Sequence, residues 1–294
     1  MQILRFVNAS GQIQYGAQHV DGRVTTVELD WAAGFHDTGR TATVAKRLAP
    51  VAPTAIYCIG LNYRRHAEEG KQPIPERPVL FMKAPTAVQN PGDPIMLPRK
   101  LRSDATDYEC ELAVVIGRTC KNVSRNHALE YVLGYTCAND VSARDWQITW
   151  GGSQWCRGKT FDTFCPLGPC LVTKDAIPDP NNLGIKTILN GQVMQDWNTN
   201  DMIFDVPTLI EQGITDVVVS GWFGLIVRSA TPRPIITRLN ADFDAAIKLP
   251  EVSEKLVAAG LTPVGGSAER FTALAREETE RWAKVIKSRG IKAE

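Results

Sequence analysis

The chain changes its hydrophobic pattern about two-thirds of the way along, and this change limits the folds open to it. Before residue 210, short apolar runs of strand length alternate with Pro- and Gly-containing turns, and helical periodicity is scarce. Later, apolar residues recur at helical spacing in segments 232–249, 250–259 and 267–288. The sequence therefore predicts an α+β chain, in which a β-rich core of mixed strands is joined to a helical C-terminal tail.

Length and local sequence divide the chain further. At 294 residues it is about two domains long, given a usual domain size of roughly 100–200 residues. Two strand-like runs near the start, residues 3–7 and 24–29, are separated by Gly-containing turns. We expect a small β-rich unit over residues 1–48, a larger β-rich core over 49–210 and a helical segment over 211–294.

Further local signals mark the ends of the helices and the strands of the core. The hydroxyls of Thr231 and Ser267 are predicted to cap helices by accepting hydrogen bonds from free backbone N–H groups. Pro232 and Pro250 suit the first helical position. Five apolar runs predict the core strands, at residues 56–60, 79–83, 109–116, 133–138 and 170–173.

Charge, apolar stretches and cysteines exclude several classes of protein. With 33 Lys and Arg against 32 Asp and Glu, the chain has no global field to attract nucleic acid or an anionic membrane. The longest apolar stretch, residues 217–227, is shorter than the roughly 18 residues needed to cross a bilayer. The start of the sequence lacks the features of a signal peptide, so we expect a cytoplasmic protein. The seven cysteines show no Cys-x-x-Cys spacing and are expected to be buried thiols.

Two glutamates in one predicted strand suggest a metal site. Glu109 and Glu111 are two residues apart, so their carboxylates lie on the same face of the strand. Such a pair beside an apolar run is costly to desolvate unless a positive charge lies between the two. Asp140, at the end of another apolar segment, is a natural third ligand, and three carboxylates suit Mg²⁺ or Mn²⁺ rather than zinc. The alternative is a solvated strand edge.

Three further polar residues could serve such a site. Lys159, in a Gly-flanked loop, could hold a substrate carboxylate or a developing oxyanion. His66 and Glu69 are three residues apart, so on one helical turn the glutamate could orient the imidazole to take a proton from water. Alone, Lys159 is more typical of a surface lysine, and His66 with Glu69 of an exposed polar helix start.

Five stretches, in order along residues 50–209, resemble the fumarylacetoacetate hydrolase family. They are Gly60-Leu61-Asn62-Tyr63, Pro78-Val79-Leu80-Phe81-Met82-Lys83, Asp107-Tyr108-Glu109-Cys110-Glu111, Ala138-Asn139-Asp140-Val141-Ser142 and Gly158-Lys159-Thr160-Phe161-Asp162. The resemblance implies a mixed β-sandwich roll, usually dimeric.

The resemblance also implies roles for individual residues. Glu109, Glu111 and Asp140 would bind Mg²⁺, or Mn²⁺ or Ca²⁺ in its place. His66 and Glu69 would form a water-activating dyad on a mobile lid, and Lys159 would bind substrate. Lys83 and Arg144 are candidate substrate-binding cations if they line the same cavity as the carboxylates, and structural cations otherwise.

The chemistry implied by the family acts on small 2-oxo acids. We expect hydrolysis of a C–C bond in an acylpyruvate-like substrate, in which a metal-bound enolate holds the released electron density and His66 supplies hydroxide. Decarboxylation and isomerisation use the same residues and stay open as alternatives.

The C-terminal part resembles a second family, the solute-binding proteins of tripartite tricarboxylate transporters. The stretches that carry this resemblance are Ser220-Gly221-Trp222-Phe223-Gly224-Leu225, Leu249-Pro250-Glu251-Val252, Pro263-Val264-Gly265-Gly266-Ser267 and Arg281-Trp282-Ala283-Lys284-Val285-Ile286. We infer a fusion with its junction within residues 206–212. Residues 215–221 would then replace a strand of the first family, and Trp222 would stand where that family has a threonine.

This departure leaves two alternatives to the enzyme. One is a metal-binding remnant that does not turn over, because the substrate loop after the junction is missing. The other is a solute-binding protein, which the tail suggests and the start of the sequence argues against.

Overall fold

The computed structural model describes residues 1–30, 34–152, 154–212, 224, 226–228, 230–258 and 263–289. The chain forms two compact units, Met1–Val218 and Val219–Glu294. The proposed replacement strand at residues 215–221 and Trp222 lie outside the described residues. Helices of the described ranges are all too short or too polar to span a membrane.

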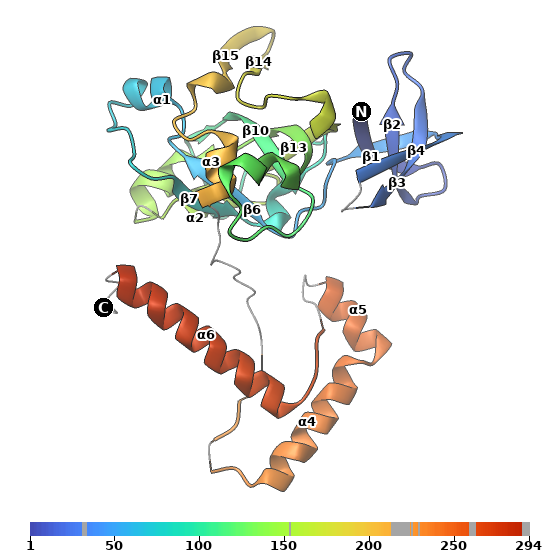
Figure 1. Ribbon diagram of the computed structural model, residues 1–294, viewed down its shortest axis with the longest axis vertical. Coiled ribbons are helices and arrows are strands. Elements are labelled where there is room, and N and C mark those ends of the chain that lie inside the picture. Colours follow the sequence, from blue (N-terminus) through green and yellow to red (C-terminus); the bar gives the residue numbers. More distant parts are fainter. Residues whose placement is uncertain are drawn as a thin grey trace. The chain divides into compact units, whose positions relative to one another are not determined.

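The first unit is built around one large sheet, whose strands lie in the order β10 (Cys110–Ile116), β11 (Val132–Asn139), β13 (Cys165–Thr173), β1, β2, β3 and β4. Its N-terminal strands form an antiparallel meander (Figure 1): β1 (Gln2–Asn8), β2 (Ile13–Gln18), β3 (Val24–Asp30), β4 (Gly34–Thr41) and β5 (Val44–Leu48), the last paired with β1. Gly11 and Gly22 have positive φ angles, which favour glycine, in the turns after β1 and β2.

The N-terminal strands are continuous with the core. Strand β1 pairs with β13 (Cys165–Thr173), with Ile3 opposite Leu171. Both side chains are fully buried in one cluster with Ala17, Val27 and Leu133. Residues 1–48 therefore share a sheet and a hydrophobic cluster with the rest of the unit.

All five predicted core strands are present. They are β6 (Ile56–Gly60), β7 (Val79–Lys83), β10 (Cys110–Ile116), β11 (Val132–Asn139) and β13. Strands β6 and β7 pair only with each other among the described residues, whereas β10, β11 and β13 form consecutive antiparallel pairs of the large sheet. The shorter strands are β8 (Val88–Gln89), β9 (Thr106–Asp107), β12 (Ser142–Ala143), β14 (Gly184–Leu189) and β15 (Gln192–Asn198).

Short helices connect these strands. The α-helices are α1 (Arg64–Glu69), α2 (Trp155–Lys159) and α3 (Val206–Gln212). A π-helix, η3 (Asp145–Trp150), follows β12, and such helices are frequent near functional sites. The remaining turns are 3₁₀-helices: η1 (Pro85–Ala87), η2 (Arg125–Tyr131), η4 (Lys174–Ala176) and η5 (Thr199–Asp201).

The second unit is helical, as the periodicity predicts. It consists of α4 (Arg233–Ile247), α5 (Pro250–Ala258) and α6 (Ala268–Arg289). Ser267 caps α6, accepting a hydrogen bond of 3.2 Å from the Arg270 amide, as expected. The predicted cap at Thr231 is wrong: Pro232 has an extended ψ of 137°, so the helix starts one residue later and Pro232 is its N-cap.

The expectation of buried cysteines is correct only in part. All seven thiols are free, but only Cys58 and Cys165 are buried, and Cys137 is exposed. An apolar run in a strand of a half-exposed sheet has one face toward solvent, so the hydropathy of the run does not decide on which face a cysteine lies.

Candidate functional site

Three carboxylates from two neighbouring strands converge in the first unit. Glu109 directly precedes β10, Glu111 lies in β10, and Asp140 directly follows β11. The register pairs Cys110 with Asn139, and the Asp140 amide donates a 2.9 Å hydrogen bond to the Glu109 carbonyl. One carboxylate oxygen from each acid lies within 4.8 Å of the others. The structure thus brings together the three residues that the sequence proposed as metal ligands.

Three cations alternate with two of these acids. The Lys159 ammonium lies between them, 2.8 Å from Glu109 Oε2 and 2.7 Å from Asp140 Oδ2. The outer oxygens are held by Arg144, 2.5 Å from Glu109 Oε1, and by Lys83, 2.5 Å from Asp140 Oδ1. Every oxygen of Glu109 and Asp140 therefore has a cation beside it, which offsets the cost of burying the two charges.

Glu111 has a different environment. Among the described residues, no cation lies within ion-pair distance of its carboxylate. Burial, reinforced by the charges of Asp140 and Glu109, raises the pKa of Glu111 to about 8. Burial also tends to raise the pKa of Glu109, but Lys159 and Arg144 outweigh it and lower the pKa below its usual value. Glu111 is therefore the one acid of the three that has no positive charge beside it among the described residues.

The donor set fits a hard divalent cation. All three groups offer oxygen, and their ligand atoms lie close enough to share one ion. A divalent cation bound there would place a positive charge beside the Glu111 carboxylate, with which no lysine or arginine of the described residues forms an ion pair. Glu109, Glu111 and Asp140 are accordingly the residues that would hold Mg²⁺ or Mn²⁺.

The three candidate substrate-binding cations, Lys83, Arg144 and Lys159, contact the cluster but are engaged with protein groups. Lys83 is 1% exposed and also donates to the Val141 carbonyl at 3.1 Å. The Arg144 guanidinium is shared between Glu109, Asp107 at 2.8 Å and Gln147 at 3.0 Å. Lys159 is 3% exposed, and its ammonium lies 5.0 Å from the centre of the Phe81 ring.

The structure does not bring His66 and Glu69 to the carboxylates. Both are exposed on α1, and Glu69 forms an ion pair of 3.4 Å with Arg65, one turn away. Within the described ranges, neither side chain forms a hydrogen bond or ion pair with the cluster. Their role as a water-activating dyad stays a prediction.

Several supporting residues were not singled out from the sequence. Ser142 is buried and donates to the Asp140 carbonyl at 2.9 Å and to Glu109 Oε1 at 3.3 Å. The Asn139 side chain accepts a 3.1 Å hydrogen bond from the Glu109 amide. The available signal was their position in the same motif as Asp140.

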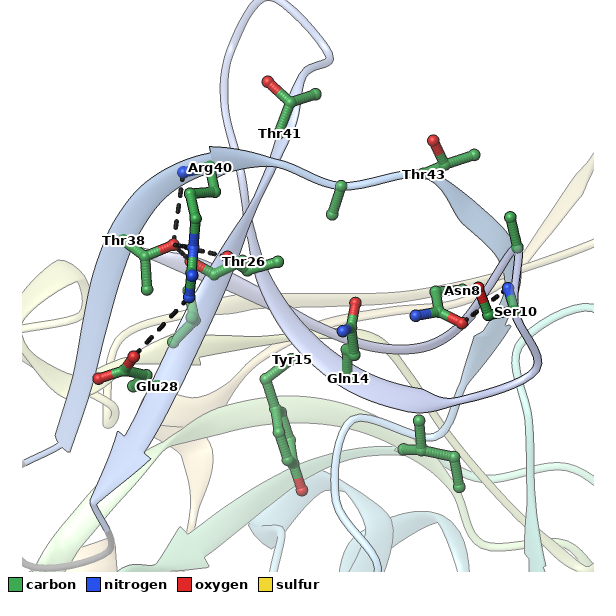
Figure 2. Close-up of a pocket in the computed structure, with 14 residues that line it drawn as sticks. Asn8, Ser10, Gln14, Tyr15, Thr26, Glu28, Thr38, Arg40, Thr41 and Thr43 are labelled. Carbon is green, nitrogen blue, oxygen red and sulfur yellow. Dashed lines mark hydrogen bonds and ion pairs between the residues drawn. The ribbon is translucent and has the colours of Figure 1, made fainter.

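A separate hollow of about 690 Å³ lies over the N-terminal sheet (Figure 2). It is lined by short polar side chains such as Thr26 and Thr38, and by Arg40, which lies 3.9 Å from Glu28. None of the residues proposed for the site lines it. These polar groups largely contact each other, so we place the functional site at the carboxylates.

Comparison with family models finds two matches along the chain. Residues 55–221 match the fumarylacetoacetate (FAA) hydrolase C-terminal model, and residues 193–291 match the tripartite tricarboxylate transporter family receptor model. The predicted junction at 206–212 lies within the overlap of the two matches. Both resemblances seen in the sequence are confirmed.

Individual relatives agree with the first match. The mitochondrial oxaloacetate tautomerase fahd2 of Xenopus laevis is 51% identical over 164 residues, which are 55% of this chain and 51% of that protein. A protein of Archaeoglobus fulgidus is 45% identical over 228 residues, 78% of this chain and 84% of that one. The chain spans about half the length of the tautomerases it matches.

Solved structures agree as well. A 5-carboxymethyl-2-hydroxymuconate delta-isomerase from Mycobacterium smegmatis has a TM-score of 0.64 and 37% identity, covering 73% of this chain and 82% of that one. A fumarylacetoacetate hydrolase from Exiguobacterium antarcticum has a TM-score of 0.62 and 33% identity, covering 72% and 80%. With its α+β fold, its acidic cluster and a matched region of more than half its length, the chain belongs to the fumarylacetoacetate hydrolase family.

Proposed function

We propose that the protein is a divalent-cation-dependent tautomerase of small 2-oxo acids, with oxaloacetate as the first substrate to test. The observation that carries this proposal is the assembled cluster of Glu109, Glu111 and Asp140, in which Lys159 lies between Glu109 and Asp140. Tautomerisation needs a site that polarises the 2-oxo group and stabilises negative charge on its oxygen. Relatives named as oxaloacetate tautomerases support the choice of reaction.

In this proposal the chain's own residues hold charge. A divalent cation, when bound, would supply Lewis-acid polarisation of the substrate carbonyl. Burial by itself would lower the pKa of Lys159, but Glu109 and Asp140 raise it above its usual value, so this residue acts as a fixed cation rather than as a base. It would stabilise the negative charge on the substrate oxygen of the enolate, which forms when the enol gives its hydroxyl proton to water and ends when water returns a proton to the neighbouring carbon.

The partners are part of the same proposal. The small-molecule partner is a 2-oxo acid, and the family resemblance favours a homodimer. Gel filtration with light scattering tests the second point, with a mass near twice 32.3 kDa as the expected result.

Tautomerase activity can be tested with the purified full chain. The enol form of oxaloacetate absorbs ultraviolet light, and we expect its decay to accelerate with Mn²⁺ or Mg²⁺ and to return to the spontaneous rate with a chelator. Glu109→Gln should abolish the acceleration, while Glu28→Gln, at a 73% exposed acid of β3, should not. A wild-type chain that binds Mn²⁺ but neither accelerates the decay nor releases pyruvate from an acylpyruvate would be the non-catalytic remnant instead.

Hydrolysis of an acylpyruvate C–C bond is the second candidate. It is favoured by the presence of His66 and Glu69 together on α1 and by similarity to the Exiguobacterium hydrolase. Release of pyruvate from a short acylpyruvate, lost in His66→Asn while tautomerisation persists, would support it. Equal loss of both activities in His66→Asn would place the imidazole in a step that they share.

A further inference from the structure

The surroundings of Lys83 set it apart from a substrate-binding cation. It ends β7, a strand paired with β6, and its side chain is 1% exposed. Its ammonium donates to Asp140 Oδ1 at 2.5 Å and to the Val141 carbonyl at 3.1 Å. Both acceptors belong to consecutive residues just after β11. Lys83 therefore ties the end of β11 to β7 from inside the protein.

We infer that Lys83 is a positioning residue, which acts on the proposed metal through Asp140 and does not touch the substrate. This inference rests on the proposed metal site. Asp140 is 1% exposed, and its two oxygens have separate partners, Lys83 on Oδ1 and Lys159 on Oδ2. Because Lys83 holds Oδ1, Oδ2 is the oxygen that shares the Lys159 ammonium with Glu109.

Charge supports the same role. Asp140 is buried beside two other acids, and burying a carboxylate in such a place is costly unless cations lie next to it. Lys159 is shared between Asp140 and Glu109, whereas Lys83 is an ion-pair partner of Asp140 alone among the described residues. Without Lys83, the carboxylate of Asp140 would keep only Lys159 as a cationic partner among the described residues, and it shares that lysine with Glu109. Nothing would then hold Oδ1 in place from β7.

The test measures Mn²⁺ binding, from the paramagnetic resonance signal of the free ion, for the full chain and its variants. Since partners that orient a metal ligand typically contribute about 10–100-fold in affinity, we expect Lys83→Met to raise the Kd for Mn²⁺ at least about tenfold. Lys83→Arg should recover part of this loss. As a control, Lys46→Met should leave the Kd unchanged, because the Lys46 side chain is 52% exposed and forms its 2.8 Å ion pair with Asp93 rather than with an acid of the cluster.

Substrate kinetics separate positioning from substrate binding. At saturating Mn²⁺, Lys83→Met should lower kcat while KM for the 2-oxo acid stays within about twofold of wild type. An unchanged Kd for Mn²⁺ with a large increase in KM would overturn the inference. If the methionine variant does not fold, Lys83→Gln, which keeps a neutral donor, is measured in the same way and judged by the same outcomes.

The outcomes also separate this inference from the proposed function. Mn²⁺ binding requires no turnover, so a wild-type chain that binds Mn²⁺ without tautomerase activity contradicts the proposed function and leaves the role of Lys83 intact. A wild-type chain that does not bind Mn²⁺ contradicts both.

Discussion

The two units of this chain use their apolar residues differently. In the first unit, buried hydrophobic residues form four clusters. In the second, no hydrophobic side chain among the described residues is buried, and Ile235 and Phe243 of α4 are 50% and 49% exposed. Helical periodicity thus predicts that a helix forms, but it does not show that the apolar stripe is covered. A stable functional site also requires that the apolar side chains of its elements are buried.

Equivalent substitutions in the two units test this difference, and here we expect the largest effect. Phe6 of β1 is fully buried against Leu4 and Val24, whereas Phe243 is half exposed. Phe6→Ala should lower the free energy of unfolding by about 3–5 kcal/mol, because it removes buried area and leaves a cavity. Phe243→Ala should change it by less than about 0.5 kcal/mol. Denaturant titration followed by hydrogen exchange of peptides from each unit measures both.

The part of the chain in which hydrogen exchange increases serves as the control for this comparison. Phe6→Ala should increase exchange in the strands around β1 and leave peptides of α4 unchanged. If Phe243→Ala destabilises its unit as strongly as Phe6→Ala does the first, the second unit has a core that the exposure of its described residues does not indicate.

The two units also differ in how far their sequences could be interpreted. The period-two pattern correctly predicted that Glu109 and Glu111 share a face, because strand geometry alone fixes that relation. Asp140 was identified because it ends an apolar run that forms a neighbouring strand. The fold class and both family resemblances were likewise available from local sequence.

The contacts that could not be predicted from the sequence are those for which several side chains compete as hydrogen-bond or ion-pair partners. Lys83 lies 57 residues from Asp140, and only tertiary packing selects Asp140 and Val141 as its acceptors. His66 and Glu69 have the right spacing for a contact, yet Arg65 on the same helix pairs with Glu69. A charged partner one turn away competes well with a neutral imidazole, so spacing alone could not predict the pair.

Metal should stabilise only the first unit, and this is the second largest effect we expect. A ligand that binds only the folded state at 100 times its Kd adds about 2.7 kcal/mol to the free energy of unfolding. Saturating Mn²⁺ should therefore slow hydrogen exchange in β10 and β11 and leave α4 and α6 unchanged. Glu111→Gln should remove the effect, because it deletes the carboxylate that has no cation beside it.

The result would also bear on the site itself. Equal slowing in both units would mean that Mn²⁺ binds outside the carboxylates. Slowing of β10 and β11 that persists in Glu111→Gln would show that the ion does not need this ligand, and the three-carboxylate site would be wrong.

The smallest effect concerns α3, the last described helix of the first unit. Arg125 of η2 pairs with Asp205, which precedes α3, and also contacts Thr208. The Arg125 guanidinium is the main cause that lowers the pKa of Asp205 from 3.8 to about 2. A carboxyl whose pKa is lower in the folded state stabilises the fold above its unfolded pKa, and this contribution is lost as the pH falls from about 4 through 2.

Since Arg125 is 47% exposed, we expect the pair to contribute less than about 1 kcal/mol. Hydrogen exchange of α3 should therefore become slightly faster, relative to β1, as the pH falls over this range, and Asp205→Asn should be fast throughout. A wild-type α3 whose exchange relative to β1 does not depend on pH would mean that Val206, buried at the start of the helix, holds it without help from the ion pair. Either result shows whether the Arg125–Asp205 ion pair or the burial of Val206 holds α3, which lies at the inferred junction of the two families, on the first unit.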